Sequence, residues 1–318
     1  MLSEGNDPFC PAFQPGGCVS AASMDIIEVE NVRKAYGDNE AVAGVSLRVG
    51  EGEVVALLGP NGAGKTTTVE ILEGYRKRDS GRVSVLGMDP WHAGNSFRSK
   101  VGLVLQECAL PPGLTVRELL TLYAAYYEHA LAPREVLELV GLEGVENTRV
   151  RKLSGGQQRR IDLALALIGD PSLIFLDEPT TGFDPGARRS AWDIVKGMQA
   201  IGKTVVLTTH YMEEAYALAN RLYIITKGRV VEEGTPDAII QRSRRRTRIT
   251  FSQVEKHELP RVEGDVYVDG SSVTVETETP LTALHALTAW AITNTVTVEN
   301  LEVKNPSLED VYLELTNA

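Results

Sequence analysis

One short glycine-rich segment, GPNGAGKT at residues 59–66, constrains the fold of this chain more than any other feature. It fits the pattern G-x-x-x-x-G-K-[ST], which joins a buried strand to a helix and lets the intervening backbone wrap around a phosphate group. The apolar run Val54–Leu58 before it is typical of a buried strand, and the segment Thr66–Glu73 after it is helical in pattern and ends at Gly74. The segment predicts an α/β fold, a largely parallel sheet flanked by helices.

The residues of this loop form a predicted site for the phosphates of ATP. Its glycines allow backbone N–H groups to approach phosphate oxygens, and the N-terminus of the following helix adds its dipole. Lys65 is expected to reach the β- and γ-phosphates, and the Thr66 hydroxyl is expected to ligate Mg²⁺. The predicted contacts with ATP in this segment are Gly59, Pro60, Asn61, Gly62, Ala63, Gly64, Lys65, Thr66 and Thr67.

Two adjacent carboxylates, Asp177 and Glu178, follow the apolar run Leu173–Leu176. Neighbouring residues on a strand point in opposite directions, so the two side chains are expected to serve different purposes. Phosphoryl transfer needs a metal ligand and a group that orients the attacking water. We therefore expect Asp177 to face the metal and Glu178 to act as the catalytic base.

A second unusual helix start lies between these motifs, at Ser154-Gly155-Gly156-Gln157. Ser154 and Gln157 fit a capping box, the pattern S-x-x-Q at the first turn of a helix. Gly155 and Gly156 are poor helix formers, but they suit a backbone that must approach an anion closely. The chain is thus predicted to contain two helix N-termini that can bind phosphate.

The rest of the chain between about residues 26 and 240 alternates short apolar runs with helical patterns, as in a parallel sheet. The predicted strands are Val54–Leu58, Leu103–Leu105, Leu173–Leu176, Val205–Thr208 and Leu222–Thr226. A helical block runs from about Leu114 to Leu142 and begins with a predicted capping box of Thr115 and Glu118. Its apolar stripe indicates either a subdomain core or a docking face for a partner; the members are Val116, Leu119, Leu120, Tyr123, Tyr126 and Tyr127.

Composition bears on nucleic-acid binding, membrane insertion and cellular location. The formal net charge of −11 disfavours general nucleic-acid binding, which depends on Lys and Arg neutralising phosphates. No apolar run approaches the roughly 18–20 residues that cross a bilayer, so any membrane path is expected on another chain. The three cysteines show no metal-binding or disulfide spacing, which favours a reducing, cytoplasmic location; they are Cys10, Cys18 and Cys108.

The sequence divides into four predicted segments. Residues 1–24 lack the features of a secretory signal and are expected to form a disordered extension, with Met24 as an alternative start of translation. Residues 25–241 are the predicted nucleotide-binding domain, with a helical subdomain at about 107–152, and the Arg-rich residues 242–248 form a linker. Residues 249–318 are expected to form a small α+β domain of strands at 248–251, 273–275 and 296–303 and helices at 281–291 and 306–316.

With Leu153 before Ser154, the second helix start reads Leu-Ser-Gly-Gly-Gln, and residues 26–240 resemble the nucleotide-binding domain of ABC transporter ATPases, a family marked by that sequence. The resemblance implies an ABC-type P-loop NTPase fold with a helical subdomain. It also implies that Tyr36 stacks on adenine, that Gln106 senses the metal and faces the membrane partner, and that His210 contacts the γ-phosphate. Asp184, in Thr181-Gly182-Phe183-Asp184-Pro185, matches a residue that communicates across a dimer; only Phe183, where leucine is commoner, departs from the family pattern.

The same resemblance implies a head-to-tail dimer, with a homodimer expected but a heterodimer left open. Ser154 and Gly156 of one subunit would close over the ATP held by Lys65 of the other. Opening and closing of this dimer would drive a separate membrane permease, which places the chain at the cytoplasmic face of the cell membrane.

The C-terminal residues Asn305–Leu313 resemble the tail of drug- and antibiotic-export ATPases of bacteria and archaea, the daunorubicin-resistance type. This resemblance favours export of a drug-like, antibiotic or lipid-like substrate. The alternatives are an importer ATPase, a soluble ABC protein of translation or DNA repair, and a nucleotide switch without hydrolysis. Residues Glu178 and His210 disfavour the last of these.

Overall fold

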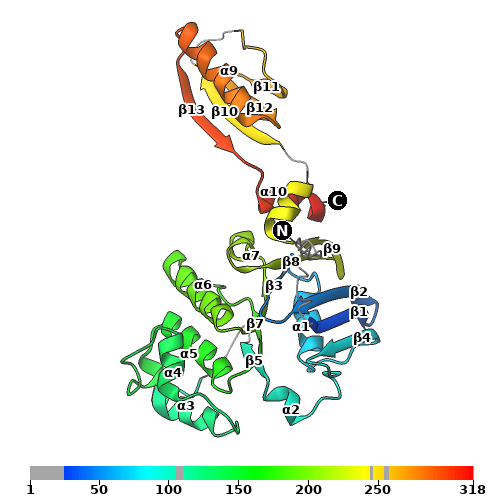
Figure 1. Ribbon diagram of the computed structural model, residues 1–318, viewed down its shortest axis with the longest axis vertical. Helices are drawn as coiled ribbons and strands as arrows, with labels where there is room; N and C mark the ends of the chain where they lie inside the picture. The colour runs from blue at the N-terminus through cyan, green and yellow to red at the C-terminus, as the bar shows by residue number, and fades with distance from the viewer. Residues whose placement is uncertain (1–24, 105–109, 244–245, 254–257, 318) are drawn as a thin grey trace, which may run out of the picture.

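The computed structural model describes residues 25–104, 110–243, 246–253 and 258–317 (Figure 1). Several predictions concern residues outside these ranges, namely the N-terminal extension, the three cysteines, Leu105, Gln106 and the linker residues Arg244 and Arg245. Among the described residues, no helix is both long enough and apolar enough to cross a membrane.

A six-stranded sheet organises the larger unit. In spatial order its strands are β5 (Val101–Val104), β6 (Leu173–Asp177), β7 (Thr204–Thr209), β3 (Val54–Leu58), β8 (Arg221–Thr226) and β9 (Arg229–Gly234). The first five are parallel and β9 is antiparallel to β8. Every residue of β3 is buried, as expected for a strand covered on both faces. The predicted α/β class and parallel sheet are confirmed.

Alternate residues of this sheet enter two separate hydrophobic cores. On one face, Val55 and Leu57 pack with α1 (Lys65–Leu72), α2 (Asn95–Arg98) and a three-stranded antiparallel sheet. The strands of that sheet are β1 (Asp25–Tyr36), β2 (Asn39–Gly50) and β4 (Ser80–Val85), in the order β2-β1-β4. The sequence patterns did not predict this sheet, in which β1 and β2 form a hairpin and β1 also pairs with β4, about fifty positions further along the chain.

The opposite face of the large sheet is covered by helices. They are α3 (Val116–Ala124), α4 (Pro133–Leu139), α5 (Gly155–Leu167), α6 (Pro185–Ala200), α7 (Met212–Leu218) and α8 (Pro236–Arg242), with a 3₁₀ turn at Val150–Lys152. The predicted capping box is present at the start of α3, where Thr115 N–H donates to Glu118 Oε2 at 2.8 Å.

The apolar stripe of α3 serves as core along most of its length. Val116, Leu119 and Leu120 are fully buried, whereas 78% of Tyr126 is exposed just beyond the helix. The core interpretation is therefore confirmed for the first three residues, and Tyr126 is left on the surface.

A second, smaller unit follows α8 and contains a four-stranded antiparallel sheet (Figure 1). Its strands are β10 (Thr247–Gln253), β11 (Asp265–Asp269), β12 (Ser272–Thr277) and β13 (Val298–Lys304), in the order β11-β12-β10-β13. One helix, α9 (Pro280–Thr293), covers the sheet and buries Ala283 and Leu287 against Ile249, Phe251 and Val273. Strand β11 was not predicted, since all five of its residues are exposed.

The final helix, α10 (Leu308–Asn317), returns to the larger unit. Its residues Leu308, Val311 and Tyr312 are buried in the core cluster that also contains Leu218 of α7 and Ile239 of α8. The sequence pattern predicts this helix as part of the small domain, and the structure differs because the apolar side of α10 packs on the first unit. The small domain is thus inserted between α8 and α10.

Candidate nucleotide site

The phosphate loop lies between the end of β3 and the start of α1, as predicted. Lys65 is almost fully buried, and its Nζ donates to the carbonyl oxygens of Gly59 at 2.8 Å and Pro60 at 3.1 Å. Burial lowers the pKa of Lys65, while the nearby Glu178 and Asp177 carboxylates act in the opposite direction. The loop therefore surrounds a lysine ammonium that two carboxylates face.

Two glycines of the loop are required by its packing. Gly64, the N-cap of α1, has φ 100°, and a Cβ there would lie 2.2 Å from the Ala41 carbonyl oxygen. A Cβ on Gly59 would lie 2.2 Å from the Ile225 carbonyl oxygen. Since no side chain caps the N-terminus of α1, its first-turn N–H groups are open to an anion.

Asp177 ends strand β6 and faces the start of α1. The Thr66 hydroxyl lies 3.5 Å from Asp177 Oδ1, and the Thr208 hydroxyl donates to the same oxygen. The contact with Thr208 follows from strand register, because Asp177 is paired with Thr208 across the parallel strands β6 and β7. Asp177 and Thr66 thus present two oxygen ligands side by side, the ligand type that Mg²⁺ prefers.

Glu178 follows the end of β6, so the turn after the strand, and not the alternation of a strand, sets the direction of its side chain. Its backbone has φ 46°, an uncommon conformation for a residue with a side chain, and its N–H donates to the Thr208 hydroxyl at 3.0 Å. Its Oε1 lies 3.2 Å from His210 Nδ1, and its Oε2 accepts a hydrogen bond from the Thr181 hydroxyl at 3.0 Å. The carboxylate is held in place from two sides at the edge of the sheet.

The second helix start forms the predicted capping box. Ser154 N–H donates to Gln157 Oε1 at 3.0 Å, and Gln157 N–H donates to Ser154 Oγ at 3.3 Å. A Cβ added to Gly155 or to Gly156 would have no neighbour within 4 Å, so this backbone faces open space. Among the described residues, no hydrogen bond connects Ser154 to the phosphate loop, whereas Gly155 and Gly156 line a pocket together with Glu178, Thr181 and Asp184.

The other predicted residues occupy distinct places. Tyr36 ends β1 with 42% of its surface exposed, and its ring centroid lies 5.2 Å from the Arg76 guanidinium and 5.7 Å from Lys34 Nζ. Asp184 caps α6 by accepting hydrogen bonds from two backbone N–H groups at 2.9 Å, a structural role that the Asp before Pro185 at the first helical position could have indicated. Gln106 lies outside the described residues.

Glu73 was not singled out from the sequence, because no motif marks it. It follows α1, and burial, together with the negative charges of Asp177 and Glu70, raises its pKa to about 8. The supporting contacts of Thr208 and Thr181 were also missed, since they depend on strand register and on the turn after β6.

Comparisons with known proteins agree with this geometry. The sequence profile of the ABC transporter family matches residues 42–181. A second profile matches residues 247–307 and is described as the C-terminal domain of proteins like ABC transporter domain-containing protein. The daunorubicin resistance ATP-binding protein DrrA2 of Streptomyces coeruleorubidus is 40% identical over 305 residues, which cover 91% of this chain and 94% of that protein. The chain belongs to the ATP-binding subunits of ABC transporters.

Further relatives and solved structures support the same family. The Nod factor export ATP-binding protein I of Paraburkholderia xenovorans is 44% identical over 220 residues, 67% of this chain and 72% of that protein. The structure of cbiO1 from Clostridium perfringens, part of the cbiONQ complex, matches with a TM-score of 0.62 and 27% identity over 69% of this chain and 92% of that one. A dimeric cassette in a post-hydrolysis state with ADP and Pi matches with a TM-score of 0.59 and 30% identity over 66% and 98% of the two chains. This ABC subunit is thus a nucleotide-binding ATP hydrolase.

Proposed function

We propose that this subunit hydrolyses ATP to energise export of a drug-like, antibiotic or lipid-like compound through a separate membrane permease. The observation that carries the hydrolytic role is the divergence of two adjacent carboxylates, Asp177 toward Thr66 and Glu178 toward His210. Export is supported by the relatives described as drug-resistance and Nod factor export proteins.

The residues of the phosphate site divide the chemistry between them. Lys65 and the N–H groups of the loop would bind the β- and γ-phosphates, and Thr66 with Asp177 would hold Mg²⁺, whose charge neutralises phosphate oxygens when bound. Glu178 would orient the attacking water and accept its proton. His210, whose Nδ1 lies 3.2 Å from Glu178 Oε1, would contact the γ-phosphate.

Adenine and the second subunit would complete the site. Tyr36 offers an exposed ring for stacking, and Gln106 would sense the metal. The helix start at Ser154 and Gly156, whose glycine backbone faces open space, would cover ATP bound by a second copy, with Asp184 at the same contact. The resulting head-to-tail dimer would work against the permease at the cytoplasmic face of the membrane.

The hydrolytic assignment can be tested with Glu178→Gln. This change keeps the size of the side chain but removes the base, so we expect turnover to fall by about 10²-fold or more with ATP affinity retained. Glu143→Gln, at an exposed position beyond α4, is the matched control and should leave turnover unchanged. Near-normal steady-state hydrolysis by Glu178→Gln would refute the assignment.

The export assignment can be tested by purifying the tagged subunit from its own membranes in mild detergent. A stoichiometric partner with about six apolar spans, and without an extracellular binding protein, is the expected result. A stable complex with ribosomes or DNA would leave the ATP chemistry intact and contradict export.

A further inference from the structure

Helix α9 of the small domain exposes an uncharged face. The stretch from Thr279 to Val298 contains no Lys, Arg, Asp or Glu, in a chain of which 24% is charged. The side of α9 opposite the buried Ala283 and Leu287 carries four residues spaced by four, three and four, which places them on one face. We call these residues the α9 stripe: Leu281, His285, Thr288 and Ile292. Leu281 is 82% exposed and Ile292 is 79% exposed.

An apolar groove lies next to the C-terminal end of the stripe, between α9 and the edge strand β13. It is lined by Phe251, Leu284, Leu287, Trp290, Ile292 and Leu301, among others. Its volume of about 220 Å³ exceeds the roughly 150 Å³ of a cavity that holds benzene, so one large aliphatic side chain can enter it. No described residue of this chain fills the groove, and Leu301 is 48% exposed at its edge.

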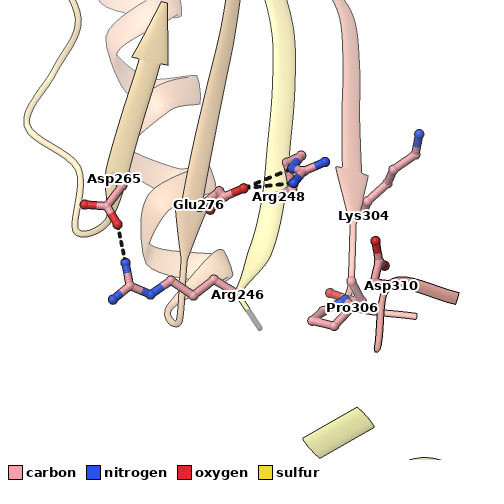
Figure 2. Close-up of a pocket in the computed structure, with 8 residues that line it drawn as sticks. Arg246, Arg248, Asp265, Glu276, Lys304, Pro306 and Asp310 are labelled. Carbon is pink, nitrogen blue, oxygen red and sulfur yellow. Dashed lines mark hydrogen bonds and ion pairs between the residues drawn. The ribbon is translucent and has the colours of Figure 1, made fainter. Parts of the chain in front are cut away.

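A second pocket of the small domain, between the ends of its strands and the start of α10, is polar and carries no proposal (Figure 2). Its cations are already paired with carboxylates of the same domain: Arg246 donates to Asp265 at 2.6 Å, and Arg248 donates to Glu276 at 2.9 Å. The α9 stripe with its groove, by contrast, is apolar and has no partner among the described residues.

The surrounding charges argue against a lipid surface as the cover. Helices that lie on membranes carry Lys and Arg beside their apolar face. The residues that bound the uncharged stretch are Glu278 and Glu299, and both are acidic. Glu278, just before the helix, is paired with Arg246 at 3.4 Å, and Glu299 lies on β13, so neither bound of the stretch supplies a cation that would attract anionic headgroups.

The stripe is instead complementary to itself. Leu281 and Ile292 are equally distant from the midpoint of the helix, and so are His285 and Thr288. If two copies of α9 pack antiparallel about a two-fold axis through that midpoint, Leu281 meets Ile292 twice and His285 meets Thr288 twice. The Thr288 hydroxyl already donates to the Leu284 carbonyl oxygen at 2.7 Å, which leaves its oxygen as an acceptor for a His285 N–H.

We propose that the small domain is a self-association module. In it, α9 packs antiparallel on α9 of a second copy, and Leu281 of each chain enters the groove beside Ile292 of the other. A contact of one helix per chain falls below the roughly 1,200 Å² of a stable interface, so it is weak by itself. The larger units of the same two chains can also bind each other, in the head-to-tail dimer. The α9 contact would therefore retain the second subunit while that dimer is open at its ATP sites.

Cysteine cross-linking of the full chain tests the register. The background is a chain in which serine replaces Cys10, Cys18 and Cys108. Without nucleotide and with EDTA, Leu281→Cys/Ile292→Cys should give disulfide-linked dimers on mild oxidation. Leu281→Cys alone should not, because the two copies of residue 281 would lie about 16 Å apart along the helix, beyond disulfide reach. Efficient cross-linking of the single variant would overturn the antiparallel packing.

Sedimentation equilibrium of the nucleotide-free full chain tests the contact itself. We expect a dimer whose dissociation constant rises at least tenfold in Ile292→Asp, since a carboxylate would enter an apolar contact. Ile201→Asp, at a position 51% exposed at the end of α6, is the matched control and should leave the constant unchanged. A wild-type chain that stays monomeric at about 100 μM overturns the proposal. Binding of that monomer to phosphatidylcholine vesicles would assign the stripe to lipid instead. Neither outcome bears on hydrolysis or export.

Discussion

A side chain added to the phosphate loop can disturb it in two ways, by backbone strain or by a steric clash. Three glycines of the loop allow these two effects to be measured separately. Gly62 has φ 79° but open space around its missing Cβ, so Gly62→Ala introduces backbone strain alone. Gly59 is outside the left-handed region, but its Cβ would lie 2.2 Å from the Ile225 carbonyl oxygen, so Gly59→Ala introduces a clash alone. Gly64 combines φ 100° with a Cβ position 2.2 Å from the Ala41 carbonyl oxygen.

The expected magnitudes follow from these contacts. Strain of an alanine in the left-handed region is about 1–2 kcal/mol, partly offset by the lower entropy of the unfolded chain, so Gly62→Ala should lose about 1 kcal/mol. A carbonyl oxygen at 2.2 Å from the new Cβ forces the backbone to move, and Gly59→Ala should lose about 3 kcal/mol, the upper range of overpacking. Gly64→Ala should lose about 4 kcal/mol, the sum of both effects.

Urea unfolding of the nucleotide-free chain in EDTA, followed by far-UV circular dichroism, measures these differences without contributions from ligand binding. The order Gly62→Ala, Gly59→Ala, Gly64→Ala in increasing loss of stability is the decisive result. If Gly64→Ala and Gly62→Ala were equally stable, the contact with Ala41 would contribute nothing and the reasoning would be refuted.

Three further predictions concern individual side chains. Lys65→Ala should abolish nucleotide binding in an equilibrium titration, because the ammonium that faces the phosphates is lost; retained affinity would contradict its role. Ser154→Arg should leave ATP binding by the monomer intact and block ATP-driven dimerisation, so an ATP-bound dimer in light scattering would show that this helix start does not cover ATP. The pKa of Glu73 is raised from 4.5 to about 8, so the folded state holds this proton more tightly than the unfolded state. The stability that results is fully present below pH 4.5 and is lost as the pH rises through 8. In EDTA, the stability of Glu73→Gln relative to the wild type should therefore rise by about 2–3 kcal/mol from pH 6 to pH 9, and parallel stability curves from urea unfolding would exclude the shift.

Local patterns predicted the parts of this protein that depend on neighbouring residues. The capping boxes at Thr115 and Ser154 connect residues three apart, and the phosphate loop is specified by its own glycines and by Lys65. These features could be predicted because their geometry depends on a few consecutive residues.

Features that depend on distant pairing were missed. The pairing of β1 with β4 joins residues about fifty positions apart, such as Val29 and Val83. Strand β11 has no buried residue that would mark it in the sequence. The periodicity of α10 indicated a helix but not the surface that it covers, and Thr208 reaches Asp177 only through the register of two parallel strands.

The insertion of the small domain between α8 and α10 has a mechanical consequence. Two segments of chain enter and leave the domain side by side, and the Thr247 hydroxyl donates to Asn305 Oδ1 at 3.1 Å where they meet. A domain on a single tether can swivel in every direction, whereas two neighbouring tethers allow bending about one axis and resist twisting. The segment after Asn305 leads into α10, which is buried in the core of the larger unit beside α8, so rotation of the small domain would pull directly on that core.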